Sequence, residues 1–347
     1  MPAQIGTRAT RTDQAGHPNK EETMFRRTLL ITAASIVCLG AAQAVAEPKT
    51  VAIANFGEHP QLNAVAEGFK AEILASGLVE GTDVVFTTDH VNFETTLLPQ
   101  MISKIDATNP ALVLAITTPV AQNVKNQIGA KGLPLVFAAV TDPVAAGLVP
   151  SWDKGDTNMS GATDAVDIKA TLAFARKLFP EARIIGVPYN PGEANDVATL
   201  ELFKTHAAAA GFEIVEVGID NTNDIQARIT ALAGKADLVY GPGSNLIQPA
   251  ISAVAAAANE AKIPLINTDP GLVNEGVIPA AFAVSYEKIG HIAGSIAIRA
   301  LKGEAMAGIA PVSPAYEDHA ITISKRAMDA IGKPIPDGFA GCGCIVD

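Results

Sequence analysis

Short apolar runs alternate with longer amphipathic stretches from residue 50 to about residue 300. The runs at 112–116 and 135–139 are apolar at every position, which is typical of strands buried on both faces of a parallel sheet. The stretch 62–74 instead places Val65, Phe69 and Ile73 at helical spacing. Strands that alternate with helices predict an α/β fold, with helices covering both faces of a parallel sheet.

The same pattern restarts after about Thr163, so the chain divides into two halves. The fold class that we predict is α/β, with two doubly wound parallel-sheet lobes joined by a hinge. We place the hinge where the chain crosses at 161–166 and at 283–286. Strands are predicted at 50–55, 84–87, 112–116, 135–139, 184–187, 214–217, 238–240 and 265–267, and helices at 62–74, 95–105, 168–178, 197–209, 225–232 and 251–261.

The two halves share a local motif, a strand followed by a helix, a second strand and the tripeptide Thr-Asp-Pro. The tripeptide occupies 141–143 in the first half and 268–270 in the second. It starts 28 positions after Val113 and 29 positions after Val239. This correspondence indicates two similar lobes. The alternative is that Thr-Asp-Pro recurs only because it suits turns and helix starts.

Ligands of open parallel sheets bind in the crevice beyond the carboxyl ends of the strands. Two lobes that face each other with these edges would enclose one small molecule, and hinge closure would bury it. The candidate residues that follow predicted strand ends are Thr117, Thr118, Thr141, Asp142, Tyr189, Asn190, Ser244, Asn245 and Asp269.

The loop 189–195 runs from a strand end into a helix start, where free main-chain amides favour an anion such as a ligand carboxylate. An ammonium group on the same ligand would need a carboxylate partner, and Asp269 or Glu193 could supply it. The alternative is that Asn190 and Glu193 only cap the helix. The same two interpretations apply to 243–245.

Enzyme signatures are scarce in this sequence. It has no Gly-x-Ser-x-Gly elbow, no phosphate-binding loop ending in Lys and Ser or Thr, and no His-Glu-x-x-His. The histidines are scattered, except that His59 follows a strand end beside Glu58, and we keep both residues as candidates for ligand contact. We therefore predict no catalytic residues, no metal site and no cofactor.

The N-terminal region has the order of a secretory signal: basic residues at 26–27, an apolar run at 29–39 and the small-x-small sequence 44–46. We expect cleavage after Ala46 and a periplasmic location, with translation starting at Met24. The alternatives are a core helix and a lipoprotein attached at Cys38. Removing 1–46, which hold five basic and three acidic residues, changes the net charge from −11 to −13. A chain this acidic is not expected to bind nucleic acid.

The C-terminal sequence Gly-Cys-Gly-Cys at 341–344 holds the two cysteines that remain after cleavage. One residue between cysteines makes a strained disulfide unless the glycines relax it. We expect 337–347 to be a flexible, unpacked tail.

Several segments resemble a known family. They are 58–60 (Glu-His-Pro), 115–122 (AITTPVAQ), 137–149 (FAAVTDPVAAGLV), 186–195 (GVPYNPGEAN) and 259–265 (NEAKIPL). The chain resembles the tryptophan/tyrosine-type substrate-binding proteins of ABC transporters over roughly 50–336. That resemblance implies a type I periplasmic binding protein fold with three crossovers between lobes. It also implies a cleft for an amino acid, often an aromatic one, and delivery to ABC permease subunits in the membrane.

By this resemblance, the cleft is lined by Thr118, Thr141, Asp142, Tyr189, Asn190, Glu193, Asn195, Asn245 and Asp269. The chain departs from the family at 244–245, where members often carry Asp-Asn and this sequence has Ser244-Asn245. The loss of a carboxylate there puts in question how an ammonium group would be held.

The predicted organisation is an extension and signal peptide at 1–46, a first lobe at 47–163 and a second lobe at 164–284. A return segment at 285–336 completes both lobes. We expect a monomer that binds a small molecule. Two other functions stay open: a sensory receptor of the same fold, and an enzyme such as a two-lobed racemase. A racemase would need an acid/base pair or a cysteine across the cleft.

Overall fold

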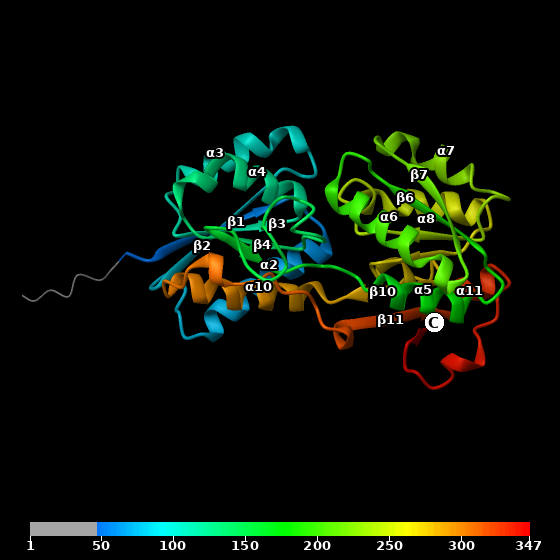
Figure 1. The fold of residues 1–347 in the computed structure, drawn as a ribbon. Helices are drawn as coiled ribbons and strands as arrows, with labels where there is room; N and C mark the ends of the chain where they lie inside the picture. The colour runs from blue at the N-terminus through cyan, green and yellow to red at the C-terminus, as the bar shows by residue number, and fades with distance from the viewer. Residues whose placement is uncertain (1–46) are drawn as a thin grey trace, which may run out of the picture. The chain divides into compact units, whose positions relative to one another are not determined.

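The computed structural model describes residues 47–347, and the predicted signal segment lies outside the described residues. The described residues contain two α/β lobes, each built on its own sheet (Figure 1). This confirms the predicted fold class. None of the helices within 47–347 is long and apolar enough to cross a membrane.

The first lobe is built on a five-stranded sheet in the order β2-β1-β3-β4-β5, and every pair of neighbouring strands is parallel. Its central strand β3 is buried at all five positions, as a sheet covered on both faces requires. The strands are β1 (Lys49–Asn55), β2 (Val84–His90), β3 (Leu112–Ile116), β4 (Leu135–Ala138) and β5 (Met159–Gly161). The helices are α2 (Pro60–Ala75), α3 (Leu98–Asp106), α4 (Thr118–Ile128) and α10 (Tyr286–Leu301).

Helices α2 and α10 cover one face of this sheet, and α3 and α4 cover the other (Figure 1). Helix α10 comes from the C-terminal part of the chain, and the two helices approach each other closely. A Cβ atom on Gly68 would lie 2.2 Å from the main-chain oxygen of Glu287, and one on Gly290 would lie 2.3 Å from that of Val65. These glycines therefore permit the contact that returns the chain to the first lobe.

The second lobe is built on a seven-stranded sheet in the order β12-β11-β10-β9-β8-β6-β7. Only the pair β10–β11 is antiparallel, so the prediction of a parallel sheet is correct up to β10. Its strands are β6 (Ile184–Tyr189), β7 (Glu213–Gly218), β8 (Leu238–Gly241), β9 (Leu265–Asn267), β10 (Ala280–Val284), β11 (His319–Ser324) and β12 (Ile345–Val346). Its helices are α5 (Ile168–Leu178), α6 (Ala194–His206), α7 (Ile225–Thr230), α8 (Ile251–Glu260), α9 (Gly271–Asn274) and α11 (Lys325–Ala330).

This sheet separates two apolar cores. One core contains side chains of α5, α6 and α11, and the other contains side chains of α7, α8 and α9. Both layers leave the carboxyl ends of β6, β8 and β9 free to carry functional loops.

The chain passes between the lobes three times. The first passage follows β5, the second lies between β10 and α10, and the third precedes β11. The first and third run side by side: the Thr163 amide donates to the main-chain oxygen of Val312 at 2.9 Å, and the hydroxyl groups of Thr163 and Ser313 lie 3.0 Å apart. The sequence indicated the first two positions, and the third has no apolar pattern that would reveal it.

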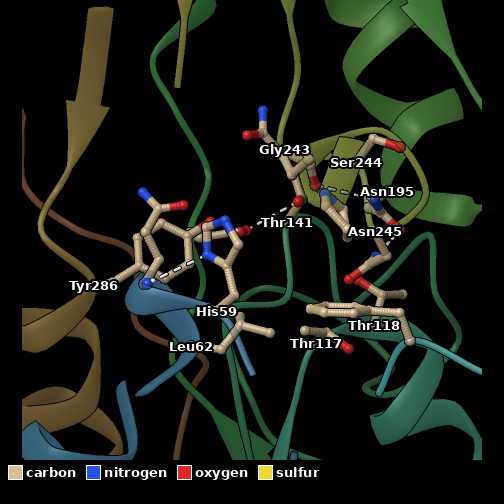
Figure 2. Close-up of a pocket in the computed structure, with 16 residues that line it drawn as sticks. His59, Leu62, Thr117, Thr118, Thr141, Asn195, Gly243, Ser244, Asn245 and Tyr286 are labelled. Atoms are coloured by element: carbon tan, nitrogen blue, oxygen red, sulfur yellow. Dashed lines mark hydrogen bonds between the residues drawn. The ribbon is translucent and has the colours of Figure 1, made fainter. Parts of the chain in front are cut away.

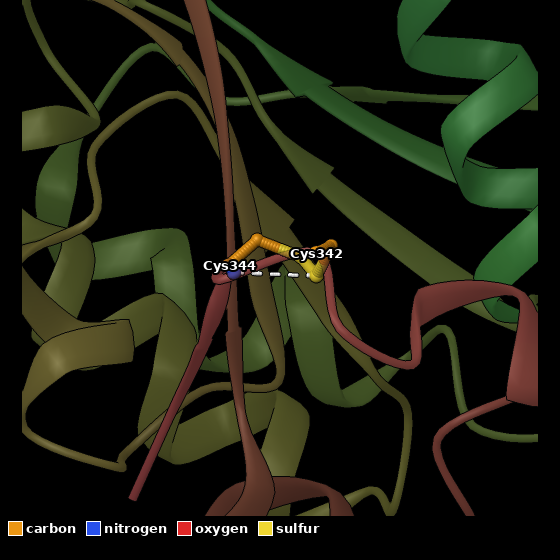
Figure 3. Close-up of a disulfide and its surroundings, with 2 residues drawn as sticks. All are labelled: Cys342 and Cys344. Atoms are coloured by element: carbon orange, nitrogen blue, oxygen red, sulfur yellow. Dashed lines mark hydrogen bonds between the residues drawn. A yellow bond between two sulfur atoms is a disulfide. The ribbon is translucent and has the colours of Figure 1, made fainter.

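The C-terminal segment differs from the flexible tail that we expected. The Phe339 side chain is only 2% exposed and packs edge-on against Phe174, with ring centroids 5.9 Å apart. Beyond it, Cys342 and Cys344 form a disulfide (Figure 3), and β12 pairs with β11. Burial of the large apolar ring of Phe339 in the core stabilises the packed position of this segment. Phe339 is therefore the residue of this segment whose apolar side chain indicates packing, and the expectation of a tail did not take it into account.

Candidate ligand-binding site

A cavity lies where the carboxyl ends of strands from both lobes meet, as the topology predicts. It holds about 440 Å³ of empty space, part of which is open solvent. In Figure 2, Thr117 and Thr118 of the first lobe face Asn195 and Asn245 of the second lobe. The residues that line it are His59, Gln61, Leu62, Phe93, Thr117, Thr118, Ala139, Thr141, Asp164, Asn195, Gly243, Ser244, Asn245, Gln248, Pro249 and Tyr286.

Thr117 has the most unusual backbone in this cavity. Its φ of 85° and ψ of 157° lie in a region that is essentially restricted to glycine, and Thr117 is β-branched. The side chain is 3% exposed, and its hydroxyl has no hydrogen-bond partner among the described residues. Backbone strain of this kind persists only where the surrounding structure holds the residue in place, and strained residues are common at ligand-binding sites. The free hydroxyl is available to a ligand.

Thr117 also stands at the N-cap position of α4, and Thr118 is the first residue of that helix. The first amides of a helix have no partner within the helix and carry a partial positive charge. A carboxylate at this end of the cavity would receive hydrogen bonds from the threonine hydroxyls and from these amides.

Asp164 supplies the negative charge of the cavity. Its carboxylate accepts hydrogen bonds from the Thr141 hydroxyl at 2.9 Å and from the Tyr286 hydroxyl at 2.8 Å. Burial raises the pKa of Asp164, and the two hydroxyl donors offset only part of that effect. No lysine or arginine lines this cavity to neutralise the charge. A buried carboxylate in a cavity with no cation beside it is suited to bind a cationic group.

The wall from the second lobe is held by a network around Glu193. The Glu193 carboxylate accepts hydrogen bonds from the amide and the side chain of Asn245, both at 2.9 Å, and from the side chain of Asn195 at 3.3 Å. The Asn190 side chain donates to the same carboxylate at 3.0 Å. Glu193 does not line the cavity, so it orients Asn195 and Asn245 from behind.

Gln248 adds a second polar atom without a partner. Its amide nitrogen donates to the Pro242 main-chain oxygen at 2.6 Å and to the Asn267 side-chain oxygen at 2.8 Å. Its oxygen is buried and has no hydrogen-bond partner among the described residues. Because these bonds fix the orientation of the amide, Gln248 offers an acceptor to a ligand.

His59 caps the start of α2 in the first lobe, and it also lines the cavity. Its Nδ1 accepts from the Gln61 amide at 3.3 Å, so this nitrogen is occupied. Burial lowers the pKa of His59, and the charge of Asp269 acts in the opposite direction. The ring therefore favours its neutral form and offers an N–H donor on Nε2.

The structure brings together seven of the thirteen residues that the sequence suggested: His59, Thr117, Thr118, Thr141, Asn195, Ser244 and Asn245. The other six do not line this cavity. Glu58 lies near His90, Tyr189 ends β6, and Asn190 and Glu193 belong to the supporting network. Asp142 and Asp269 accept hydrogen bonds from main-chain amides of their own loops.

Sequence reasoning missed Asp164, Tyr286, Gln248 and Phe93. Asp164 and Tyr286 lie on two passages between the lobes, 122 positions apart in the sequence. They belong to no recognisable motif, and only the fold places them together. Both residues lie in the predicted hinge crossings at 161–166 and 283–286, and that position was the signal that could have drawn attention to them.

The family assignment comes from a comparison of the whole chain. Residues 50–337 match the family model described as "ABC transporter substrate binding protein". The chain belongs to this family. Substrate-binding proteins of this kind lie outside the cytoplasm and bind a small molecule for an ABC transporter, so the resemblance stated above is confirmed.

Three relatives illustrate the similarity of this substrate-binding protein to known ones. A protein of Clostridioides difficile named "Tyrosine-binding protein" is 34% identical over 283 residues, covering 82% of this chain and 81% of that protein. The crystal structure of a conserved domain protein from Vibrio cholerae has a TM-score of 0.80 at 29% identity and covers 87% of this chain and 100% of its own. The ligand-free, open structure of the Clostridium difficile substrate-binding protein CD0873 has a TM-score of 0.66 at 32% identity, over 86% of this chain and 98% of that one.

Proposed function

We propose that this substrate-binding protein is a receptor for an aromatic α-amino acid, which it delivers to an ABC importer by hinge closure. The observation that carries the proposal is the pairing of two buried groups across one cavity. Asp164 offers an unneutralised carboxylate, and Thr117 offers a hydroxyl without a partner at the start of a helix. These groups complement the ammonium and the carboxylate of a zwitterion.

The ammonium of the ligand would bind the Asp164 carboxylate, which the Thr141 and Tyr286 hydroxyls hold in place. A charge-assisted hydrogen bond of this kind is stronger than a neutral one, and burial strengthens it further. The ligand carboxylate would bind Thr117, Thr118 and the first amides of α4. This arrangement replaces our expectation that Asp269 or Glu193 pairs with the ammonium, because neither residue lines the cavity.

The choice of an aromatic amino acid rests on two further points. The relative that is 34% identical over most of its length is named as a tyrosine-binding protein. Within the cavity, Phe93 packs edge-on against Phe56, with ring centroids 5.5 Å apart, so an aromatic surface already lies near the proposed site.

We further propose that the protein acts without catalysis, as a monomer secreted by a cleaved signal peptide. Both cysteines of the described chain form a disulfide in the C-terminal segment, far along the sequence from the cavity residues that a racemase would use. Sedimentation at monomer mass, independent of concentration, would support the monomer, and N-terminal sequencing of the exported protein at Glu47 would support cleavage. Loss of labelled amino-acid uptake on gene deletion would separate transport from sensing.

Calorimetric titration of the chain from Glu47 onward tests the ligand directly, after unfolding and refolding to remove any bound ligand. We expect tyrosine, tryptophan or phenylalanine to bind, and sugars and nucleosides not to bind. Asp164→Asn should weaken binding about 100-fold, because it removes a buried charge-assisted contact worth about 3 kcal/mol. Sugar binding without amino-acid binding, or full affinity in Asp164→Asn, would overturn the proposal.

The same variant has a distinct signature in folding. Because the pKa of Asp164 is raised in the folded state, that state binds more protons than the unfolded chain, and its stability falls as pH rises above the unfolded value of about 4. Asp164→Asn should remove this dependence and leave the ligand-free protein at least as stable at neutral pH. Weak binding would then come from the lost charge and not from misfolding.

A further inference from the structure

A second cavity adjoins the proposed amino-acid site. It holds about 620 Å³ of empty space, against about 440 Å³ for the first. Asp164, Thr141, Tyr286 and Gly243 line both cavities, so they form a shared boundary. A molecule whose ammonium binds Asp164 lies at this boundary and can extend into either space.

The walls of the second cavity are mainly apolar. They include Val166 from the first passage between lobes, Ile168 at the start of α5, Val284 at the end of β10, and Ala198 and Leu202 from α6. The first cavity has apolar side chains too, Leu62 and Phe93 among them, but it also presents a larger set of polar groups: Thr117, Thr118, Asn195, Ser244, Asn245 and Gln248. An aromatic ring placed among those groups would deprive them of water without replacing their hydrogen bonds, which is costly. The second cavity carries less of this cost, because most of its exposed lining is apolar.

Two large apolar side chains stand at this cavity, one from each lobe. Trp152 follows β4 in the first lobe and is 42% exposed, and Leu202 of α6 in the second lobe is 43% exposed. An aromatic ring between them would cover apolar surface on both lobes at once. Such contacts would favour the closed state of the lobes, because they exist only when both walls meet the ligand.

Polar groups also reach this cavity: Asp142, Thr199 and Thr268 line it beside the shared boundary, and so does Tyr240. The Tyr240 side chain is 2% exposed and lines the second cavity, with its ring 4.5 Å from that of Phe203. Its hydroxyl forms no hydrogen bond with any residue in 47–347, whereas the Tyr286 hydroxyl is bonded to Asp164. Burial and the nearby charge of Asp164 raise the pKa of Tyr240, so the hydroxyl keeps its proton. A ligand that covers this hydroxyl without offering it a hydrogen bond would pay the cost of desolvating it.

We propose that the second cavity is the side-chain compartment of the site, and that Tyr240 makes it selective for a ring that carries a hydrogen-bonding group. The compartment takes a phenol or an indole in preference to a plain phenyl ring, because only the first two can satisfy the Tyr240 hydroxyl. Sites that hydrogen-bond a ligand group discriminate strongly against analogues that lack it. This inference rests on the proposed amino-acid function and adds the determinant of its specificity.

The test compares tyrosine, tryptophan and phenylalanine on the wild-type chain and on Tyr240→Phe, by calorimetric titration. Tyr240→Phe removes one oxygen and keeps the ring packed on Phe203, so folding should be unaffected. We expect the affinity for tyrosine or tryptophan to fall about tenfold while that for phenylalanine stays the same. Tyr316→Phe is the matched control, because Tyr316 is 67% exposed and lies outside both cavities, and it should change nothing.

A second variant tests the compartment without the hydroxyl. Ala198→Leu narrows the second cavity from the α6 side and should abolish binding of all three aromatic amino acids, whereas alanine or serine should bind as in the wild type. The single tryptophan of the chain reports the same event, because a tyrosine ligand beside Trp152 should shift its fluorescence.

The outcomes separate this inference from the proposed function. If the wild type binds no amino acid, the proposed function fails and the inference fails with it. If the wild type binds aromatic amino acids but Tyr240→Phe and Ala198→Leu bind them equally well, the second cavity is not the side-chain compartment, and the amino-acid function stands.

Discussion

The two lobes carry the same Thr-Asp-Pro loop after corresponding strands, and the loops do different work. In the first lobe the Thr141 hydroxyl donates to Asp164 and lines both cavities. In the second lobe Thr268 lines only the second cavity, and its hydroxyl lies 3.4 Å from the Gln248 side-chain nitrogen. The two threonines therefore differ in their contacts: Thr141 bonds to the buried charge, and Thr268 supports the cavity wall.

The aspartates of the two loops have kept a common role. The Asp142 carboxylate accepts from the Val144 and Ala145 amides at 3.0 and 2.9 Å, and that of Asp269 accepts from the Gly271 amide at 2.6 Å. Both close a turn, as the alternative interpretation of the sequence held. The same tripeptide thus closes a turn in both lobes, and in the first lobe alone its threonine also bonds to the buried charge.

Replacing each threonine with valine should give the largest difference in ligand affinity between the two loops. Thr141→Val removes a donor from the Asp164 carboxylate and should weaken amino-acid binding about tenfold. Thr268→Val should weaken it less than about threefold, because its one contact is long and neutral. Calorimetric titration measures both, and Thr141→Ser, which keeps the hydroxyl, is the control. Equal losses in the two valine variants would contradict the division of roles.

The apolar pattern of the sequence predicted some strands and cavity residues correctly and could not assign a position to others. The apolar runs located β3 and β9 to the residue, because a strand buried on both faces tolerates few polar positions. Thr117 and Thr118 were found because they follow such a strand. Asn190 and Glu193 were placed on the ligand because a helix start and an anion site share the same chemistry. In the structure they lie behind Asn195 and Asn245, and that position depends on a contact between Glu193 and Asn245, 52 positions apart.

Asp164 shows why the rest could not be predicted. It lies in a passage between lobes, where no periodic pattern applies, and its partners Thr141 and Tyr286 are 23 and 122 positions away. Tyr240 reads as an ordinary strand residue, since nothing in the sequence distinguishes a hydroxyl with a partner from one without. Hydrogen-bond satisfaction is a property of the packed structure, and the selectivity of the site depends on it.

Replacing each of the two aspartates with alanine tests their role in stabilising the turns. Asp142→Ala and Asp269→Ala should each lower the free energy of unfolding by about 1 kcal/mol, because each leaves turn amides without an acceptor. For a chain of this size that corresponds to a fall of about 2 °C in the melting temperature. Ligand affinity should change less than about threefold in Asp269→Ala, because Asp269 lines neither cavity, whereas Asp142 lines the second cavity and its variant is read for stability alone.

Asparagine at the same positions keeps the side-chain oxygen that accepts from the amides, so Asp142→Asn and Asp269→Asn should retain most of the stability. A large loss of amino-acid binding in Asp269→Ala, with Asp164→Asn unaffected, would move the ammonium partner from Asp164 to Asp269.

The smallest expected effect concerns the C-terminal edge of the second sheet, where β12 pairs with β11. There the amide of Ile323 in β11 donates to the main-chain oxygen of Cys344 at 2.8 Å, and the disulfide to Cys342 lies at the start of β12 (Figure 3). The bond closes a loop of three residues, and so short a loop restricts the unfolded chain little. Replacing both cysteines with serine should therefore cost about 1 kcal/mol of folding stability or less and leave ligand affinity unchanged.

Hydrogen exchange at the Ile323 amide should nevertheless accelerate, because β12 would separate from β11 more often. A thiol reductant on the wild type should have the same effect, whereas a reductant that weakens ligand binding would show that the C-terminal edge acts on the cleft and not only on β11.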